Sequence, residues 1–220
     1  MSRAAEIAAS LGGILARIDA AARRAGRDPA WVTLVAVTKT KPLEDVLAAY
    51  EAGVRHFGEN RVQEAETKFP HLPPDAVRHL IGSIQSNKAN RAARLADAVH
   101  AVDSADIARR LARAAAAGKR RLAVYVEVNT GDEETKAGVT PAGAPALVEA
   151  VRALGELDLR GLMAIPPPGD TRPHFVALRN LAASLGLSGL SMGMSDDFEA
   201  AIEEGATVVR VGTALFGSRS

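Results

Sequence analysis

The stretch LVAVTKTKP, residues 34–42, places two amines close together. Lys39 ends an apolar run that is typical of an interior β-strand, and Lys41 follows two positions later. Desolvation and a neighbouring positive charge both favour the neutral form of a lysine amine, which is the nucleophile that attacks an aldehyde. A lysine at a strand end can also extend its ammonium group into solvent without any chemistry. The other strand ends must decide between these interpretations.

A second group of candidate residues lies in the later stretches SMGMS and TVVRVGTALFG. Gly212 and Thr213 form a turn after an apolar run, where backbone N–H groups and a hydroxyl group can bind phosphate. Ser195 precedes a helical stretch, so it can either donate to the same anion or cap that helix. Arg210 is a permanent charge inside an apolar strand, which favours a ligand-facing role over a structural ion pair.

Eight short β-like runs must position these residues, and helical stretches alternate with them along the chain. The pattern predicts an α/β fold, a single (β/α)8 TIM barrel, in which functional residues gather at the carboxyl ends of the strands. A doubly wound open sheet is the structural alternative. The expected strands are 32–39, 56–59, 79–82, 98–102, 122–129, 159–163, 189–192 and 207–211.

Residues 1–27 precede the first expected strand and are rich in arginine and alanine, a composition that organellar transit peptides share. Their apolar residues instead indicate an extra N-terminal helix packed on the barrel, because they recur at helical spacing on one stripe. That stripe consists of Ile7, Leu11, Ile14, Leu15 and Ile18. No linker or repeat divides the chain, so residues 1–220 are expected to form a single domain.

Composition excludes several classes of function. The chain has 27 lysines and arginines against 26 acidic residues, so it has no overall field that would gather nucleic acid or an anionic membrane. No apolar run approaches the roughly 20 residues that span a bilayer. The absence of cysteine excludes disulfides, thiolate nucleophiles and cysteine-ligated metals. A chain without cysteine is compatible with a reducing cytoplasm, which is the location we expect. The histidines show no metal-ligand spacing, so we expect no metal site.

The most basic local run is QSNKANRAARLA, residues 85–96. It lacks interleaved aromatic residues, so we expect a solvated helix face rather than a nucleic-acid patch. Lys88 lies just after an expected strand, where a second phosphate-bearing ligand or a client protein could contact it.

Six ordered motifs resemble the pyridoxal phosphate homeostasis protein family, whose members are single barrels related to the N-terminal domain of alanine racemase. The motifs are AVTKTKP, HFGENRVQE, HLIGSIQSNK, RGLMAIPPP, SMGMSDDFEAAIEEGA and RVGTALFG. The similarity covers nearly the whole chain from about residue 32. Arg78 and the compact segment between PPPGD and SMGMS depart from the pattern of many relatives, which bears on loops rather than on the candidate site.

The resemblance implies a role for each candidate residue. Lys39 would hold pyridoxal 5′-phosphate (PLP) as an internal Schiff base, and Arg210 would lie beside the pyridine nitrogen. Three residues would hold the phosphate: Ser195, Gly212 and Thr213. Two further residues would line the same pocket: Asn60 and Met163.

The same resemblance implies a protein that stores, delivers or buffers PLP in vitamin B6 homeostasis, with little or no catalytic turnover. Racemisation needs proton carriers on both faces of the substrate carbon, and Tyr50 and Tyr125 fit packing roles better. Glu59 fits a helix cap or a salt bridge better than proton transfer. Two alternatives stay open, a PLP-dependent amino-acid racemase or lyase of restricted scope and a phosphate-ester isomerase. PLP-dependent apo-enzymes are the expected partners, and a monomer is the expected state.

Overall fold

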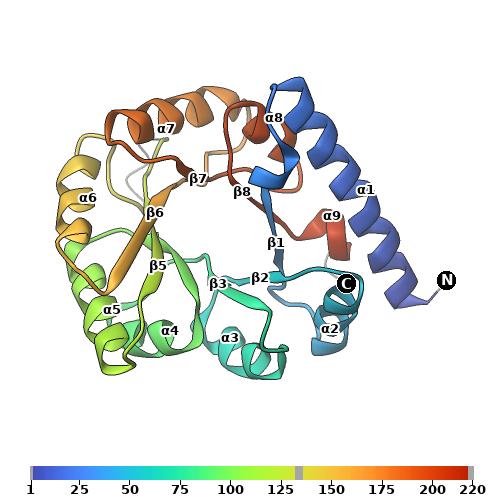
Figure 1. Ribbon diagram of the computed structural model, residues 1–220, viewed down its shortest axis with the longest axis horizontal. Helices are drawn as coiled ribbons and strands as arrows, with labels where there is room; N and C mark the ends of the chain where they lie inside the picture. Colours follow the sequence, from blue (N-terminus) through green and yellow to red (C-terminus); the bar gives the residue numbers. More distant parts are fainter. Residues whose placement is uncertain (1, 132–135, 218–220) are drawn as a thin grey trace.

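A computed structural model describes residues 2–131 and 136–217 as a closed barrel of eight parallel strands surrounded by helices (Figure 1). Neighbouring strands pair in chain order, and the last strand pairs with the first, so the predicted (β/α)8 fold is confirmed. The strands are β1 (Thr33–Val37), β2 (His56–Glu59), β3 (Val77–Leu80), β4 (Ala98–Val102), β5 (Leu122–Glu127), β6 (Leu157–Met163), β7 (Gly189–Ser191) and β8 (Val208–Val211).

A helix follows each strand on the outside of the barrel, which explains why the outward faces of the strands carry buried apolar residues. These helices are α2 (Leu43–Glu51), α3 (Val62–Lys68), α4 (Ala89–Leu95), α5 (Ala105–Ala117), α6 (Ala144–Arg152), α7 (Arg172–Ser184), α8 (Phe198–Glu203) and α9 (Thr213–Phe216). Short 3₁₀ turns add to them: η1 (Pro29–Trp31), η2 (Phe69–His71) and η3 (Ser86–Lys88).

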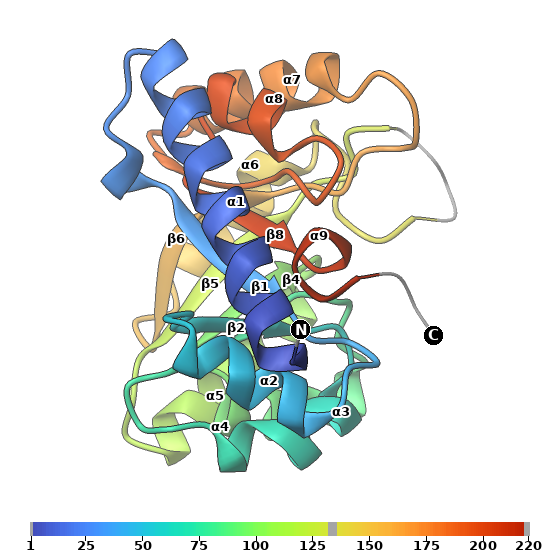
Figure 2. The ribbon, with the colours of Figure 1, turned by 90° about the vertical axis from the view of Figure 1, so that its right-hand side faces the viewer.

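The expected N-terminal helix is present as α1 (Arg3–Arg24), which lies across α2, α8 and α9 (Figure 2). Its stripe is buried as predicted except at Leu15, which is 49% exposed. Including Leu15 was wrong because successive helical residues point about 100° apart, and Ile14 takes the inward direction. The helix thus covers the seam where the first and last strands of the barrel meet.

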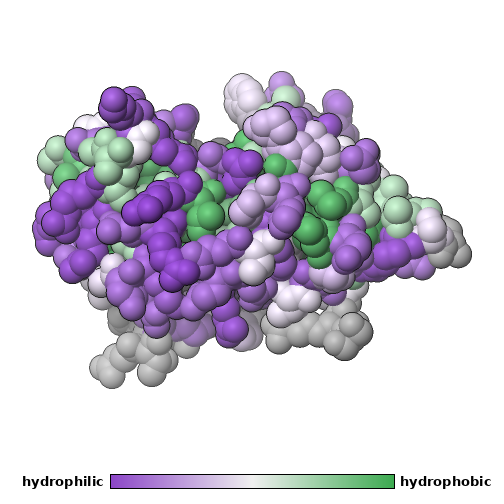
Figure 3. Space-filling view, turned by 90° about the horizontal axis from the view of Figure 1, so that it is seen from below, coloured by the Kyte–Doolittle hydropathy of each residue, from purple (hydrophilic) through white to green (hydrophobic). Residues whose placement is uncertain are grey.

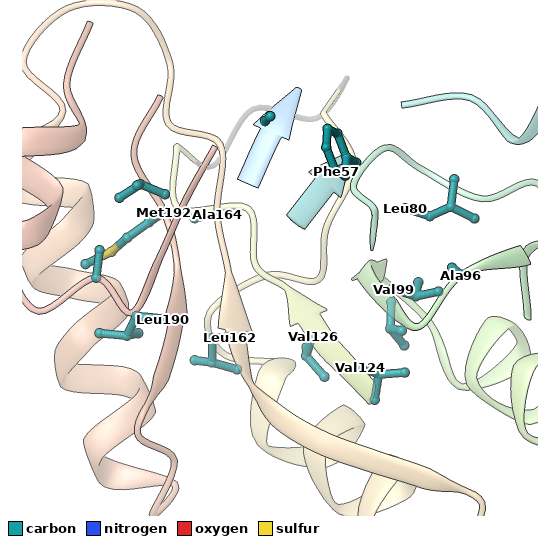
Figure 4. Packing of buried hydrophobic residues seen from close by; sticks show 14 of the residues in the cluster. Phe57, Leu80, Ala96, Val99, Val124, Val126, Leu162, Ala164, Leu190 and Met192 are labelled. Carbon is teal, nitrogen blue, oxygen red and sulfur yellow. The ribbon is translucent and has the colours of Figure 1, made fainter. Parts of the chain in front are cut away.

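Apolar side chains pack in two layers. The larger cluster lies between the strands and the helices, and alternate strand residues contribute to it (Figure 4): Phe57, Leu80, Val99, Val124, Val126, Leu162 and Leu190. A small inner cluster fills part of the barrel interior: Val35, Ala101, Tyr125, Met163 and Val208. Polar side chains occupy the rest of that interior, which is unusual because barrel interiors are mostly filled by branched apolar residues.

The surface seen in Figure 3 is mainly hydrophilic, with separate hydrophobic patches. Within the described ranges, no helix is both long enough and apolar enough to cross a membrane. Two exposed large hydrophobic residues, Ile165 and Met194, lie at the mouth of the barrel. The expected monomeric state stays a prediction.

Candidate functional site

The carboxyl ends of the strands open onto a pocket of about 410 Å³, where this fold places its functional sites. Its walls come from the ends of six strands and the loops after them. All residues predicted for the site except Met163 line it. The complete lining is Val37, Lys39, Thr40, Lys41, Asn60, Ile81, Ile165, Met194, Ser195, Asp196, Arg210, Gly212, Thr213 and Gly217.

Lys39 lies in a turn after β1 and not on the strand itself. The Thr38 carbonyl accepts the Lys41 N–H at 3.0 Å, which closes the turn, and Thr40 has a left-handed φ of 63°. The Thr40 N–H donates to Glu64 Oε2 at 2.8 Å and thereby holds this conformation in place. The expected strand end at residue 39 was wrong because the chain turns two residues earlier, yet the turn keeps Lys39 half-buried on the pocket wall.

A buried ion pair between Lys68 and Glu59 holds the backbone at the start of this turn. Lys68 Nζ donates to the Thr38 carbonyl and to Glu59 Oε1, both at 2.7 Å. The Thr38 hydroxyl donates to the same carboxylate oxygen at 2.6 Å. Burial raises the pKa of Glu59, and the hydrogen bonds from Lys68 and Thr38 act in the opposite direction. Glu59 is therefore in a salt bridge, the role that the sequence favoured, and it fixes the backbone that leads to Lys39.

Ser195 joins the loop after β7 to the start of α9. Its Oγ atom accepts the N–H groups of Gly212 at 3.3 Å and Ala214 at 3.2 Å. Of the two roles that the sequence left open for Ser195, capping of α8 is wrong, because α8 begins only at Phe198 and the Ser195 hydroxyl is already engaged with the start of α9. This hydroxyl consequently lies beside the backbone donors of the turn after β8.

The turn after β8 is tightly packed against β1 at Gly212. A Cβ atom there would lie 3.2 Å from the Val37 carbonyl oxygen, closer than nearly all such contacts, so glycine permits the close approach of β1 and β8. Thr213 then begins α9 and is exposed, and its hydroxyl group has no hydrogen-bond partner among the described residues. The turn therefore presents a free hydroxyl donor to the pocket.

Arg210 reaches the pocket from inside the barrel and is only 3% exposed. Its guanidinium group donates to Ser191 Oγ at 2.7 Å and to the Ala164 carbonyl at 2.9 Å. Burial lowers its pKa to about 10, so the group stays charged at neutral pH. Within residues 2–131 and 136–217 no carboxylate forms an ion pair with it, which agrees with a role other than a structural salt bridge.

Asn60 follows β2 and offers an unsatisfied acceptor to the pocket. Its Oδ1 atom is buried without a hydrogen-bond partner among the described residues, which is costly unless a ligand supplies a donor. Met163 is fully buried in the inner cluster of the barrel and is not on the pocket wall. The structure therefore does not bring Met163 together with the other candidates, and its role stays a prediction.

The apolar lining residues were not among the predicted site residues, whereas Lys41 was noted in the sequence as a second amine beside Lys39. Ile81, Ile165 and Met194 give the pocket apolar walls, and Lys41 adds a cation whose Nζ atom donates to the Gly217 carbonyl at 3.0 Å. Each lies within four residues after a strand end, so position alone could have marked them. The pocket thus combines cationic and apolar surfaces.

Comparisons with known proteins agree with this arrangement. Residues 10–220 match the family of the alanine racemase N-terminal domain. A Pseudomonas aeruginosa protein named pyridoxal phosphate homeostasis protein is 51% identical over 220 residues, which cover 97% of this chain and 96% of the relative. The chain belongs to the pyridoxal phosphate homeostasis protein family. The resemblance drawn from the six motifs is confirmed.

Solved structures of this family and of its distant relatives share the fold. PipY of Synechococcus elongatus, solved with PLP bound, is 40% identical with a TM-score of 0.84, over 96% of this chain and 100% of PipY. Alanine racemase of Corynebacterium glutamicum is 16% identical with a TM-score of 0.69, over 95% of this chain and 62% of the racemase. At that identity the racemase shows a common barrel and nothing more.

Besides Glu59, a second carboxylate is buried near the site. It belongs to Glu127 at the end of β5, which is 6% exposed. Its Oε2 atom has no hydrogen-bond partner in the described part of the chain. Burial, reinforced by the charge of Asp103, raises its pKa to about 7, and the charge of Arg210 acts against this shift. Around neutral pH the Glu127 carboxyl group is therefore partly protonated.

Replacing Glu127 by glutamine should stabilise the protein by about 3 kcal/mol at pH 8.5, and by less than about 1 kcal/mol at pH 5. The unfolded chain loses this proton near pH 4.5, whereas the folded chain keeps it to about pH 7. Stability from this group is therefore present at low pH and is lost as the pH rises across that window. Urea unfolding at both pH values measures the difference.

The exposed Glu51, replaced by glutamine, serves as the control and should show no such difference between pH 5 and pH 8.5. Equal stabilisation of the Glu127→Gln protein at both pH values would contradict the raised pKa.

Proposed function

We propose that this chain binds PLP as a Schiff base on Lys39 and takes part in vitamin B6 homeostasis with little or no catalytic turnover. The observation that carries the proposal is the convergence of Lys39, Arg210 and the turn at Gly212 on one pocket. The name of the Pseudomonas aeruginosa relative and the PLP-bound PipY structure support the choice of cofactor.

The chemistry of the pocket fits an anionic aromatic aldehyde. Lys41 and Arg210 make the pocket cationic, which suits an anionic cofactor, and one acidic residue, Asp196, is among the lining residues. The apolar walls suit a ring, and the unsatisfied Oδ1 atom of Asn60 suits a hydroxyl donor. PLP supplies a reactive aldehyde carbon when it is bound.

Lys39 provides the covalent link. Its neutral amine attacks the aldehyde carbon, a C=N bond replaces the C=O bond, and the oxygen leaves as water. Lys41 and Arg210 line the same pocket as this amine. The turn locked by Thr40 and Glu64 holds the amine at the wall during this step.

The turn after β8 holds the phosphate group in this proposal. Thr213 offers a free hydroxyl, and the Ser195 hydroxyl lies beside the N–H groups of Gly212 and Ala214. Charge-assisted hydrogen bonds to a phosphate dianion are stronger than those between neutral groups. The phosphate therefore anchors the cofactor independently of the covalent link.

The site also favours low turnover. A charged Arg210 beside the pyridine nitrogen disfavours protonation of that nitrogen, and an unprotonated ring is a weaker electron sink. Neither tyrosine considered for proton transfer lines the pocket: Tyr125 is buried in the inner cluster, and the Tyr50 hydroxyl donates to Asp75 on the outside. The positions of the two tyrosines support storage or delivery of PLP over racemisation, whereas a charged Arg210 is compatible with either.

The visible absorption spectrum of the purified protein with PLP, followed by borohydride reduction and peptide mass mapping, tests the proposal. An imine band together with a reduced adduct on Lys39 supports it. A protein that forms no imine would overturn the covalent part. Exchange of the α-proton of added amino acids into deuterated water tests turnover, and a rate well above that of free PLP would favour the racemase or lyase alternative.

Replacing Thr213 by valine should weaken PLP binding about tenfold to hundredfold, because a hydrogen bond to a charged group contributes about 1.5–3 kcal/mol. Valine keeps the shape of threonine and removes only the hydroxyl. Equilibrium titration of PLP, followed by absorbance, measures the dissociation constant. Inorganic phosphate should compete with PLP in the wild-type protein and less well in the variant; unchanged affinity for both anions would contradict the assignment.

Three finer expectations belong to the same proposal. The protein is a monomer, it acts in the cytoplasm, and PLP-dependent apo-enzymes receive the cofactor from it. Activation of an apo-enzyme by the loaded protein in the presence of a trap for free PLP tests the last of these. Activation that disappears with the trap would show release into solution instead.

A further inference from the structure

A chain of hydrogen bonds crosses the barrel interior and ends on Arg210. His56 Nδ1 lies 3.0 Å from His79 Nε2, and His79 Nδ1 lies 2.9 Å from His100 Nε2. His100 Nδ1 lies 2.8 Å from Ser191 Oγ, which accepts a hydrogen bond from Arg210 at 2.7 Å. We call His56, His79, His100 and Ser191 the histidine relay.

The relay is buried where apolar side chains would pack well. His79 is 5% exposed, and His100 and Ser191 are fully buried. Polar groups at such positions cost free energy unless every one of them is hydrogen-bonded, and a fully bonded network fixes a unique arrangement. The cofactor contacts proposed above leave these groups without a role.

An irregularity in β4 directs His100 into the barrel. The pairing of β4 with β5 shifts between Val99 and Val102, so that β4 contains one extra residue. His100 and its neighbour Ala101 can therefore both face the interior, where Ala101 joins the inner apolar cluster. The bulge lets His100 reach Ser191 on β7, across the barrel from β4.

The hydrogen bonds of the relay have one consistent direction. Arg210 has only donors, so Ser191 Oγ accepts from it. The single hydroxyl proton of Ser191 has one acceptor among the described residues, which is Nδ1 of His100. A neutral His100 then carries its proton on Nε2 and donates to His79, which donates in the same way to His56. In the reverse direction the Ser191 proton would be buried without an acceptor.

The imidazole rings of the relay are neutral. Burial lowers the pKa of His79 to about 3, with a further contribution from the charge of His56. Burial, together with the charges of His79 and Arg210, lowers the pKa of His100 well below its usual range. A neutral ring has one donor and one acceptor nitrogen, as the relay requires.

Aligned in this direction, each ring points its unprotonated nitrogen along the relay toward Arg210. The negative ends of the ring dipoles thus face a guanidinium group that has no ion pair within the described residues. We infer that His56, His79 and His100, acting through Ser191, are positioning residues that hold the Arg210 guanidinium fixed at the pocket. The carboxylates of Glu127 and Asp197 favour its charge. The consequence for bound PLP rests on the proposed function, because it is there that Arg210 meets the pyridine nitrogen.

The first test uses the protein without PLP. Nitrogen-15 NMR distinguishes the two neutral tautomers of each imidazole ring and the doubly protonated form. We expect His79 and His100 to carry their proton on Nε2 at neutral pH, with slowly exchanging N–H signals. A proton on Nδ1 of either ring, or a charged ring, would overturn the inferred direction of the relay.

The second test compares Ser191→Ala and His100→Leu with a matched control, Tyr125→Phe. The Tyr125 ring lies 4.5 Å from the His100 ring in the same interior, but its hydroxyl is outside the relay. We expect the relay variants to bind PLP about tenfold more weakly and to move the pH at which the imine band titrates, because the Arg210 charge is no longer fixed. The control should change neither value.

The outcomes separate this inference from the proposed function. The positioning role is overturned if the relay variants have the same PLP dissociation constant and the same imine titration as the wild-type protein. It is also overturned if the Tyr125→Phe control changes these two values as much as the relay variants do. A wild-type protein that forms no imine on Lys39 overturns the proposed function. In that case the tautomers measured without PLP still decide whether the relay exists.

Discussion

We expect the replacement of Lys39 by alanine to abolish the imine absorption band and the borohydride-stable PLP adduct. Alanine lacks the amine that forms the C=N bond, so no residue at this position can react. Reversible binding of PLP persists through the turn at Gly212 and Thr213, which the substitution leaves intact. Absorption spectra and peptide mass mapping after reduction measure the covalent part, and equilibrium dialysis measures the reversible part.

The matched control is Lys41→Ala, since Lys41 lies in the same turn and on the same pocket wall. It should keep the adduct on Lys39, with weaker PLP binding because one positive charge near the phosphate is lost. An adduct that forms on Lys41 at the wild-type yield in the Lys39→Ala protein would show that the amine at position 39 has no special role.

Replacing Lys68 by methionine is expected to destabilise the protein by about 3–5 kcal/mol, because it leaves a buried carboxylate without its counter-ion. Glu59 is fully buried, and it then keeps only the hydrogen bond from Thr38. In a chain of this length that loss corresponds to a decrease of about 10 °C in the melting temperature. Differential scanning calorimetry measures it.

The double variant Glu59→Gln/Lys68→Met removes the charge together with its partner, so it should recover much of the lost stability. Acidification should also reduce the effect of Lys68→Met alone, since protonation of Glu59 removes the unpaired charge. A Lys68→Met protein within 1 kcal/mol of the wild type would show that the ion pair contributes little. The same variant should slow imine formation on Lys39, because Thr38 loses its support.

The barrel could be predicted from sequence because its signal is repeated. Apolar runs and helical stretches alternate along the whole chain, so an error at one boundary does not change the fold. Individual boundaries depend on single hydrogen bonds, and those are not visible in composition. β1 ends at Val37 because Thr38 starts a turn, and α8 begins at Phe198 because Ser195 bonds to α9 instead.

The candidate site was largely predictable for a related reason. Lys39, Asn60 and Gly212 each lie at or just after a strand end, and barrel closure brings all such positions to one mouth. Met163 shows the limit of this rule, because the last residue of a strand can face the interior of the barrel below the pocket. The family motif RGLMAIPPP includes Met163, but a motif does not show whether a side chain reaches the pocket or stays in the barrel interior below it.

The histidine relay could not be predicted from spacing. His56, His79 and His100 lie about twenty residues apart, which resembles no metal or catalytic motif, and the sequence indicated no shared role for them. Their contacts depend on the register of three neighbouring strands and on the bulge in β4. A bulge adds one residue without any change in hydrophobicity, so the run AVHAV reads as an ordinary strand.

The pairing of β1 with β8 has a consequence for how the protein is made. Lys39 emerges from the ribosome early, whereas the glycine turn that faces it across the seam is among the last described residues to be synthesised. In the proposed function, a chain whose β1 and β8 have not yet paired keeps Lys39 apart from the turn at Gly212, so it lacks the contacts that would select PLP from other aldehydes. Under that proposal, tight capture of PLP follows closure of the barrel, so cofactor occupancy would report that β1 and β8 have paired.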